Sequence, residues 1–152
     1  MKMINVKVRA YTGQGFGSGF IQKFTRGQAS HVSLVFDMGH TVHEIEAIQG
    51  KGVICHAPHS ASSKTYFELA VPLSYEQVID AHAMAIDLVG ARYDWKGVFS
   101  FALHRKKHNK KKWFCSELVA YVLLKVGYDV SRREPYKETP ASVVESLRLL
   151  SS

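Results

Sequence analysis

The chain has 152 residues and a mass of 17.1 kDa, which is the size of one compact domain, and we expect residues 1–152 to form one. A hydrophobic share of 46% and a charged share of 22% exclude disordered, collagen-like and coiled-coil classes. Twenty basic residues against thirteen acidic ones give a net charge of +7, which favours an anionic partner such as nucleic acid, a membrane surface or another polymer.

The sequence carries no pattern typical of export or of membrane insertion. No apolar run approaches the ~18 residues that a transmembrane helix needs. Charged or polar residues interrupt the first ten positions, so the unbroken apolar core of a signal peptide is missing. We therefore expect a cytoplasmic protein without a membrane-spanning segment. Its two cysteines, Cys55 and Cys115, are then expected to be free thiols.

The first half of the chain is predicted to form strands. Apolar and polar residues alternate over 4–10, which is typical of a half-buried strand. A glycine-rich loop is expected over 11–19, followed by a short helix over 20–24 that Ser18 opens. Further strands are expected at 31–36, 41–47, 52–57 and 66–71.

The second half is predicted to be mainly helical. Ser74 and Gln77 form a capping-box pattern at the start of a helix that Gly90 ends. Residues 93–101 are expected to be loop with a short helix. Two more helices are expected at 115–126, closed by Gly127, and after Thr139, with Pro140 in the first turn. Strands followed by helices indicate an α+β fold with an antiparallel sheet.

Cys115 is predicted to stand where a helix begins. The partial positive charge and the unpaired N–H groups of a helix N-terminus favour a thiolate, and the same N–H groups can bind the oxyanion formed when a thiolate attacks a carbonyl. A small buried side chain that packs the helix start is the structural alternative. The two interpretations stay open on this signal alone.

A nucleophilic thiol needs a base, and His31 is the strongest candidate because it opens an apolar strand. His82, in contrast, is expected on the exposed side of its helix. A turn at 37–40 would put His31 directly opposite Glu46, and His43 on the other face of the sheet. We favour Glu46 as the group that orients the imidazole. A three-residue loop would select His43 instead.

Five short motifs together resemble the circularly permuted NlpC-type papain-like amidases and the related lecithin:retinol acyltransferase-like proteins. They are SHVSLV at 30–35, EA at 46–47, GV at 52–53, FCSELV at 114–119 and TP at 139–140. The stretch GARYDWKG at 90–97 is similar to the Tyr-x-Trp-Gly segment that precedes the nucleophile in NlpC-type enzymes, with Lys96 in place of the first glycine.

The resemblance implies a papain-like core, an antiparallel sheet packed against the helix that bears the nucleophile. It also implies Cys115 as nucleophile, His31 as base and Glu46 as the third residue, with Tyr93 and Ser116 as weaker candidates for the substrate or oxyanion side. The expected function is a cysteine hydrolase, an amidase or peptidase. Its substrate would contain an amide or ester, in a cell-wall peptide, a lipid or a protein conjugate. The acyltransferase-like relatives usually have histidine as the third residue, and His43 lies twelve positions after His31, a spacing that they also use.

Other functions remain open on the sequence. The same machinery would be a thiol acyltransferase on lipids if another acceptor replaced water. A non-catalytic protein could bind an anionic polymer or nucleic acid through the loop at 105–112, with its residues Arg105, Lys106, Lys107, Lys110, Lys111 and Lys112. No cofactor is expected. A metal site at Cys55, His56 and His59 is disfavoured, because adjacent strand residues point to opposite faces.

Overall fold

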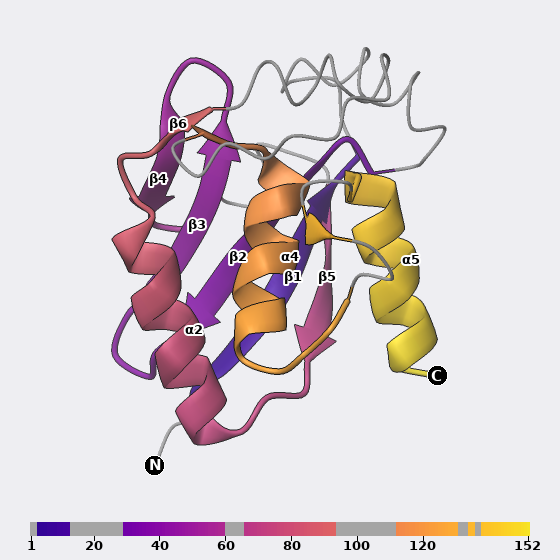
Figure 1. The fold of residues 1–152 in the computed structure, drawn as a ribbon. Helices are drawn as coiled ribbons and strands as arrows, with labels where there is room; N and C mark the ends of the chain where they lie inside the picture. Colours follow the sequence, from indigo (N-terminus) through magenta and orange to yellow (C-terminus); the bar gives the residue numbers. More distant parts are fainter. Residues whose placement is uncertain (1–2, 13–28, 60–65, 94–111, 131–133, 136–137) are drawn as a thin grey trace.

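The computed structural model describes residues 3–12, 29–59, 66–93, 112–130, 134–135 and 138–152. Within them the fold is α+β, with a five-stranded antiparallel sheet in the order β4-β3-β2-β1-β5 (Figure 1). The strands are β1 (Asn5–Tyr11), β2 (His31–Asp37), β3 (Val42–Ile48), β4 (Gly52–His56) and β5 (Tyr66–Val71). The five predicted strands are confirmed with boundaries that differ by one residue or none.

Three helices follow in the described residues, α2 (Tyr75–Asp87), α4 (Cys115–Lys125) and α5 (Pro140–Leu150). The predicted caps are present, since Ser74 accepts a hydrogen bond from the Gln77 backbone and Thr139 accepts one from Ser142. None of the helices in this part of the chain is long and apolar enough to cross a membrane. The helix expected at 20–24 and most of the stretches 11–19 and 93–101 lie outside the described residues, and Tyr11, expected in a loop, ends β1.

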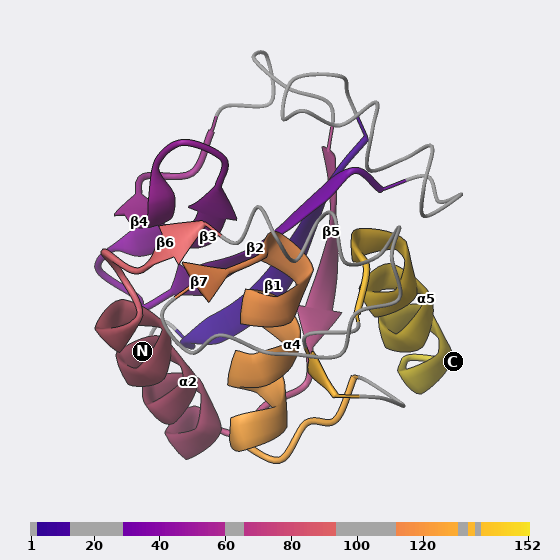
Figure 2. The same ribbon diagram turned by 45° about the horizontal axis from the view of Figure 1, so that its top comes forward.

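The helices cover the apolar face of the sheet (Figures 1 and 2). Because side chains alternate between the two faces of a strand, this face collects every second residue of each strand. These residues form one buried cluster with the helices, which includes Val8, Leu34, Ile45, Val78, Leu118, Val119 and Leu147. Burying this apolar surface fixes α4 against β2 and β3, with its first residue close to the start of β2.

The opposite face of the sheet is polar and still buried. Ser33, Glu44 and Glu46 are fully buried on it, and Arg9 is 5% exposed. The alternation of apolar and polar residues in these strands therefore does not indicate a solvent-exposed face. A buried charge is tolerated only when it has a partner, so these side chains must satisfy one another. They do so in the network described below.

The register between β2 and β3 differs from the predicted one. Asp37 pairs with Val42 and Phe36 with His43, whereas the predicted turn at 37–40 placed His31 directly opposite Glu46. The turn closes one residue later than expected, with the Met38 N–H donating to the Thr41 carbonyl at 2.9 Å. Gly39 takes φ +86° there, and its N–H donates to the Asp37 carboxylate at 2.9 Å. Glu46 is thus displaced by two residues along the strand, on the predicted face but diagonal to His31.

Two short parallel strands, β6 (Arg92–Tyr93) and β7 (Lys112–Trp113), lie beside the large sheet (Figure 2). The connection from α2 to β6 is joined to β4 by two backbone hydrogen bonds. The Val53 N–H donates to the Ala91 carbonyl, and the Gly90 N–H donates to the Val53 carbonyl, each at 2.9 Å. Since β7 leads directly into α4, this corner of the molecule places the start of that helix.

Gly52 is expected to be intolerant of substitution at this corner. It has φ +79°, and an added Cβ would lie 2.1 Å from the Ala91 carbonyl oxygen. We expect Gly52→Ala to lower the free energy of unfolding by about 3 kcal/mol, from left-handed strain plus overpacking. Urea unfolding measures this loss.

Gly50 supplies the matched control. It has φ +81° but nothing within 4 Å of an added Cβ. Gly50→Ala should therefore cost only about 1 kcal/mol, the strain alone. Equal losses for the two variants would contradict the close approach of Ala91 to Gly52.

Candidate active site

Cys115 is the first residue of α4, as predicted. The first hydrogen bond within this helix runs from the Leu118 N–H to the Phe114 carbonyl at 2.9 Å. The N–H groups of the residues before Leu118 have no carbonyl partner inside the helix. They make the N-terminal end of α4 electropositive. The Glu117 carboxylate accepts a hydrogen bond from the Phe114 N–H at 3.4 Å and so caps the helix start. The Cys115 side chain is 1% exposed.

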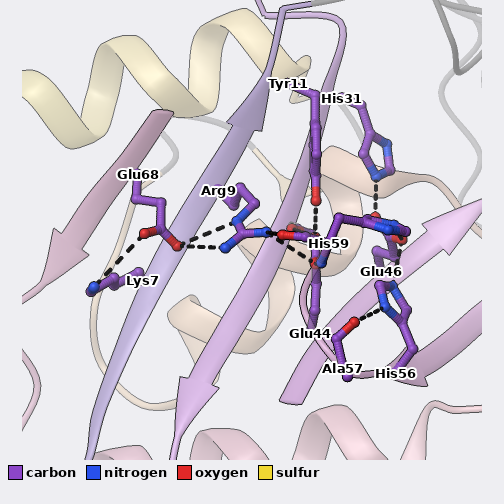
Figure 3. A network of polar contacts seen from close by, with 11 residues as sticks. Lys7, Arg9, Tyr11, His31, Glu44, Glu46, His56, Ala57, His59 and Glu68 are labelled. Atoms are coloured by element: carbon purple, nitrogen blue, oxygen red, sulfur yellow. Dashed lines mark hydrogen bonds and ion pairs between the residues drawn. The ribbon is translucent and has the colours of Figure 1, made fainter. Parts of the chain in front are cut away.

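His31 is the first residue of β2 and is 3% exposed. Cys115 lies close enough to its imidazole to raise the pKa of His31. Nε2 of His31 lies 2.7 Å from Oε2 of Glu46 (Figure 3). Because Nε2 faces the carboxylate, Nδ1 is the nitrogen left for the thiol. The three predicted residues therefore form one line, in the order Cys115, His31, Glu46.

Each of these side chains favours the charged form of its neighbour. Burial alone would lower the pKa of His31, but the charge and hydrogen bond of Cys115, and then those of Glu46, raise it to about 9. For Glu46, burial opposes ionisation, but the hydrogen bonds and charges of His31 and then of His56 lower its pKa to about 2. An ionised Glu46 beside a protonated His31 is the arrangement that stabilises an imidazolium next to a thiolate.

A second carboxylate, Glu44, holds the polar face together (Figure 3). Its Oε1 accepts hydrogen bonds from the hydroxyls of Tyr11 and, at 2.7 Å, of Ser33. Its Oε2 lies 3.5 Å from Nη1 of Arg9, which also contacts Glu68. Burial, then the hydrogen bond and charge of Glu44, raise the pKa of Tyr11, so its hydroxyl stays a donor. The Tyr11 ring lies 5.5 Å from the His31 ring, centroid to centroid, and supports it.

The structure does not place His43 near His31. His43 lies on the other face of the sheet, where its Nδ1 is 2.9 Å from Nε2 of His82. The prediction of an exposed His82 is wrong, because that side chain is partly buried against His43 and Phe36. Burial, together with the charge of His43, lowers the pKa of His82. Of the two candidates for the third residue, only Glu46 contacts His31.

The weaker site candidates have other positions. The Ser116 hydroxyl is buried and donates to the Glu138 carbonyl at 2.6 Å, so this side chain ties α4 to the start of α5 rather than facing a substrate. Tyr93 pairs with Trp113 through β6 and β7, two residues before Cys115. Trp95 and Lys96 lie outside the described residues, as does the basic loop except for the backbone of Lys112.

A metal site is not supported by the donor geometry. Single ligand atoms of Glu44, His56 and His59 lie within 4.8 Å of one another. However, Glu44 already accepts hydrogen bonds from Tyr11, Ser33, Arg9 and the His59 N–H, and both ring nitrogens of His56 face oxygen atoms. Cys55 points to the opposite face, against the apolar cluster, as strand alternation predicts. A metal ion here would have to break these contacts.

Sequence reasoning missed the polar network behind the site. It considered His56 only as a metal ligand and did not identify Arg9 or Tyr11. The signal was present in the alternating polar positions of β1, β2 and β3, at Arg9, Ser33, Glu44 and Glu46. Taken strand by strand, these positions are typical of an exposed face, and only their convergence on one buried surface reveals a network.

The comparisons with known proteins add no assignment. A scan against protein-family models finds no match, and a search of curated proteins finds no significant relative.

Proposed function

We propose that this protein is a cysteine hydrolase that cleaves an amide or ester bond, with Cys115 as nucleophile, His31 as acid–base residue and Glu46 as the residue that orients His31. The observation that carries the proposal is the 2.7 Å contact between His31 and the buried Glu46 carboxylate, together with the Cys115 thiol close enough to raise the pKa of the same His31. A fully buried, ionised carboxylate lowers the stability of a protein unless a partner compensates its charge, and His31 is such a partner of Glu46. Such perturbed, mutually supporting groups are typical of catalytic sites.

The chemistry follows from these positions. The Cys115 thiolate attacks the substrate carbonyl, and a carbon–sulfur bond forms as the carbonyl oxygen becomes an oxyanion at the helix N-terminus. The oxyanion then re-forms the carbonyl, the bond to the amine or alcohol breaks, and Nδ1 of His31 gives its proton to the leaving group. Water next attacks the thioester and transfers a proton to His31. The acid is released and the thiolate–imidazolium pair is restored.

The identity of the third residue favours the hydrolase over the acyltransferase. The resemblance of the sequence covers both NlpC-type amidases and acyltransferase-like proteins, and the latter usually have a histidine in the third position. Here Glu46 contacts His31, whereas His43 lies on the other face of the sheet. We therefore propose a permuted NlpC-type, papain-like arrangement of the α+β fold. The proposed substrates are cell-wall peptides, lipids or protein conjugates that contain an amide or ester bond.

The rate of thiol alkylation as a function of pH tests the proposed pair without a known substrate. In a Cys55→Ala background, iodoacetamide can modify only Cys115. An ordinary thiol with a pKa near 8.5 is only about 1% ionised at about pH 6.5. We expect Cys115 to react roughly 10–100-fold faster there than the same thiol in a further His31→Ala variant.

Two results would count against the pair. One is identical pH profiles with and without His31. The other is a thiol that reacts only above the ordinary pKa of cysteine. The double variant Cys55→Ala, Cys115→Ala shows the background rate.

A further inference from the structure

A second histidine, His56 of β4, binds the same carboxylate as His31. Its Nε2 lies 2.7 Å from Oε1 of Glu46, while His31 occupies Oε2 at the same distance (Figure 3). Its Nδ1 lies 2.6 Å from the carbonyl oxygen of Ala57. The His56 side chain is 22% exposed, so it connects the buried carboxylate with the protein surface.

The contact with Glu46 requires a proton on Nε2 of His56. An ionised carboxylate can only accept a hydrogen bond, and the pKa of Glu46 is lowered to about 2 by its two histidine partners, despite its burial. Nε2 must therefore be the donor to Oε1 of Glu46. Nδ1 faces the Ala57 carbonyl oxygen on the other side of the ring.

The other charged and titratable groups around His56 leave this pairing intact. Glu44 is its strand neighbour across β3 and β4, but its oxygens are occupied by Tyr11, Ser33 and Arg9. The His59 ring lies 4.6 Å from the His56 ring, and its Nε2 is 3.6 Å from Oε1 of Glu46, beyond hydrogen-bond distance. Glu46 is thus the carboxylate that Nε2 of His56 contacts at hydrogen-bond distance.

We propose that His56 is a positioning residue that clamps one oxygen of Glu46, so that the other oxygen stays directed at His31. The clamp is a property of the fold, and its catalytic consequence rests on the function proposed above. A carboxylate has two equivalent oxygens and can rotate. Without His56, the group nearest to Oε1 of Glu46 among the described residues would be the more distant His59. Glu46 would then hold the His31 ring less firmly in the orientation that presents Nδ1 to Cys115.

The first experiment measures the protonation of His56 directly. Nitrogen-15 NMR of the imidazole rings in the intact protein at neutral pH distinguishes protonated from unprotonated ring nitrogens, and His56→Asn assigns the His56 signals. We expect Nε2 of His56 to be protonated. An unprotonated Nε2 at neutral pH would overturn the proposal, because the nitrogen could then not donate to Glu46, and this measurement needs neither activity nor a substrate.

The second experiment separates the two contacts of His56 with matched variants. His56→Gln can keep the donor to Glu46, whereas His56→Asn can keep the donor to Ala57 and loses the one to Glu46. Partners that orient a functional histidine are typically worth about 10–100-fold, as known from metal sites. In the Cys55→Ala background we expect His56→Asn to slow iodoacetamide alkylation of Cys115 about tenfold at neutral pH and His56→Gln to restore most of that rate.

The control variant is His59→Ala, which removes the neighbouring histidine and should leave the alkylation rate unchanged. An unchanged rate in His56→Asn, or an equal loss in His56→Asn and His56→Gln, would overturn the positioning role. Failure of the proposed function looks different. The alkylation rate of Cys115 would then be the same with and without His31, while Nε2 of His56 would still be found protonated.

Discussion

Replacing Cys115 by alanine is expected to abolish turnover of any amide or ester substrate while the protein stays folded. Removal of the nucleophile from a catalytic triad typically costs at least about 10⁴-fold in kcat, because the remaining groups cannot form the covalent intermediate. Alanine fits the space of the thiol, which is buried at the start of α4. The free energy of unfolding should therefore change by only about 1–2 kcal/mol.

The measurement is kcat and kcat/KM on a panel of ester and amide substrates, together with urea unfolding of the same preparations. Cys55→Ala is the matched control, since Cys55 is the other free cysteine and packs against the apolar cluster on β4. We expect it to retain full activity. A Cys115→Ala protein that still turns over substrate would remove the nucleophile, and the proposed function with it.

Glu46→Gln is expected to reduce both activity and stability. The amide keeps the size of the side chain but carries no charge, and its NH₂ group cannot accept a hydrogen bond from a histidine. One of the two histidine contacts is therefore lost. The corresponding change in a catalytic triad lowers kcat about 10⁴-fold, by loss of the imidazole orientation. We expect a loss on the order of 10³–10⁴-fold in kcat, with a smaller change in KM.

The effect of Glu46→Gln on stability should depend on pH in a defined way. The pKa of Glu46 falls from 4.5 to about 2, so its contribution is present above pH 4.5 and is lost as pH falls towards 2. The pKa of His31 rises from 6.5 to about 9, so its contribution is present below pH 6.5 and is lost as pH rises through 9. Both pKa shifts arise in part from the same interaction between Glu46 and His31. This interaction therefore stabilises the fold most between about pH 4.5 and pH 6.5.

A shift from 4.5 to about 2 corresponds to roughly 3 kcal/mol, at ~1.4 kcal/mol per unit. Urea unfolding at about pH 5.5, inside the window of full contribution, should show this difference between the unsubstituted protein and the Glu46→Gln variant. The difference should shrink at about pH 9 and below about pH 3. A difference that stays constant with pH would show that Glu46 does not titrate against His31.

Glu44→Gln is the matched control for this experiment. Glu44 lies two residues away on the same strand and the same buried face, with 0% exposure like Glu46. Its partners are Tyr11, Ser33 and Arg9 rather than the histidine line. We expect Glu44→Gln to lose stability, because it leaves Arg9 with one fewer anion, and to keep kcat within a few-fold of the unsubstituted protein.

Local patterns in the sequence were enough to locate the elements of this protein and to assign residues to the faces of its sheet. Local patterns located the five strands, with alternation in the first of them, and the caps at Ser74 and Thr139 located two helices. Alternation placed Glu46 and His43 on opposite faces of their strand, and the predicted turn at 37–40 placed Glu46 on the face of His31. These features could be predicted because they depend on the period of the side chains and on short-range hydrogen bonds.

The offset between β2 and β3, in contrast, could not be predicted from such patterns. Registers that differ by two residues present the same side chains to the same faces, so the hydrophobic pattern cannot distinguish them. The folded turn selects one of them, through the positive φ of Gly39 and the hydrogen bond from its N–H to Asp37. That choice sets Glu46 diagonal to His31.

The partners of the buried charges likewise depend on the three-dimensional arrangement. His56 and His31 are 25 positions apart in the sequence, and each is near Glu46 only because β4, β3 and β2 lie side by side. A polar residue on a strand has the same local pattern whether it faces water or a buried carboxylate. The difference depends on which distant strands pack beside it, because burial makes an unpaired charge costly and a paired one tolerable.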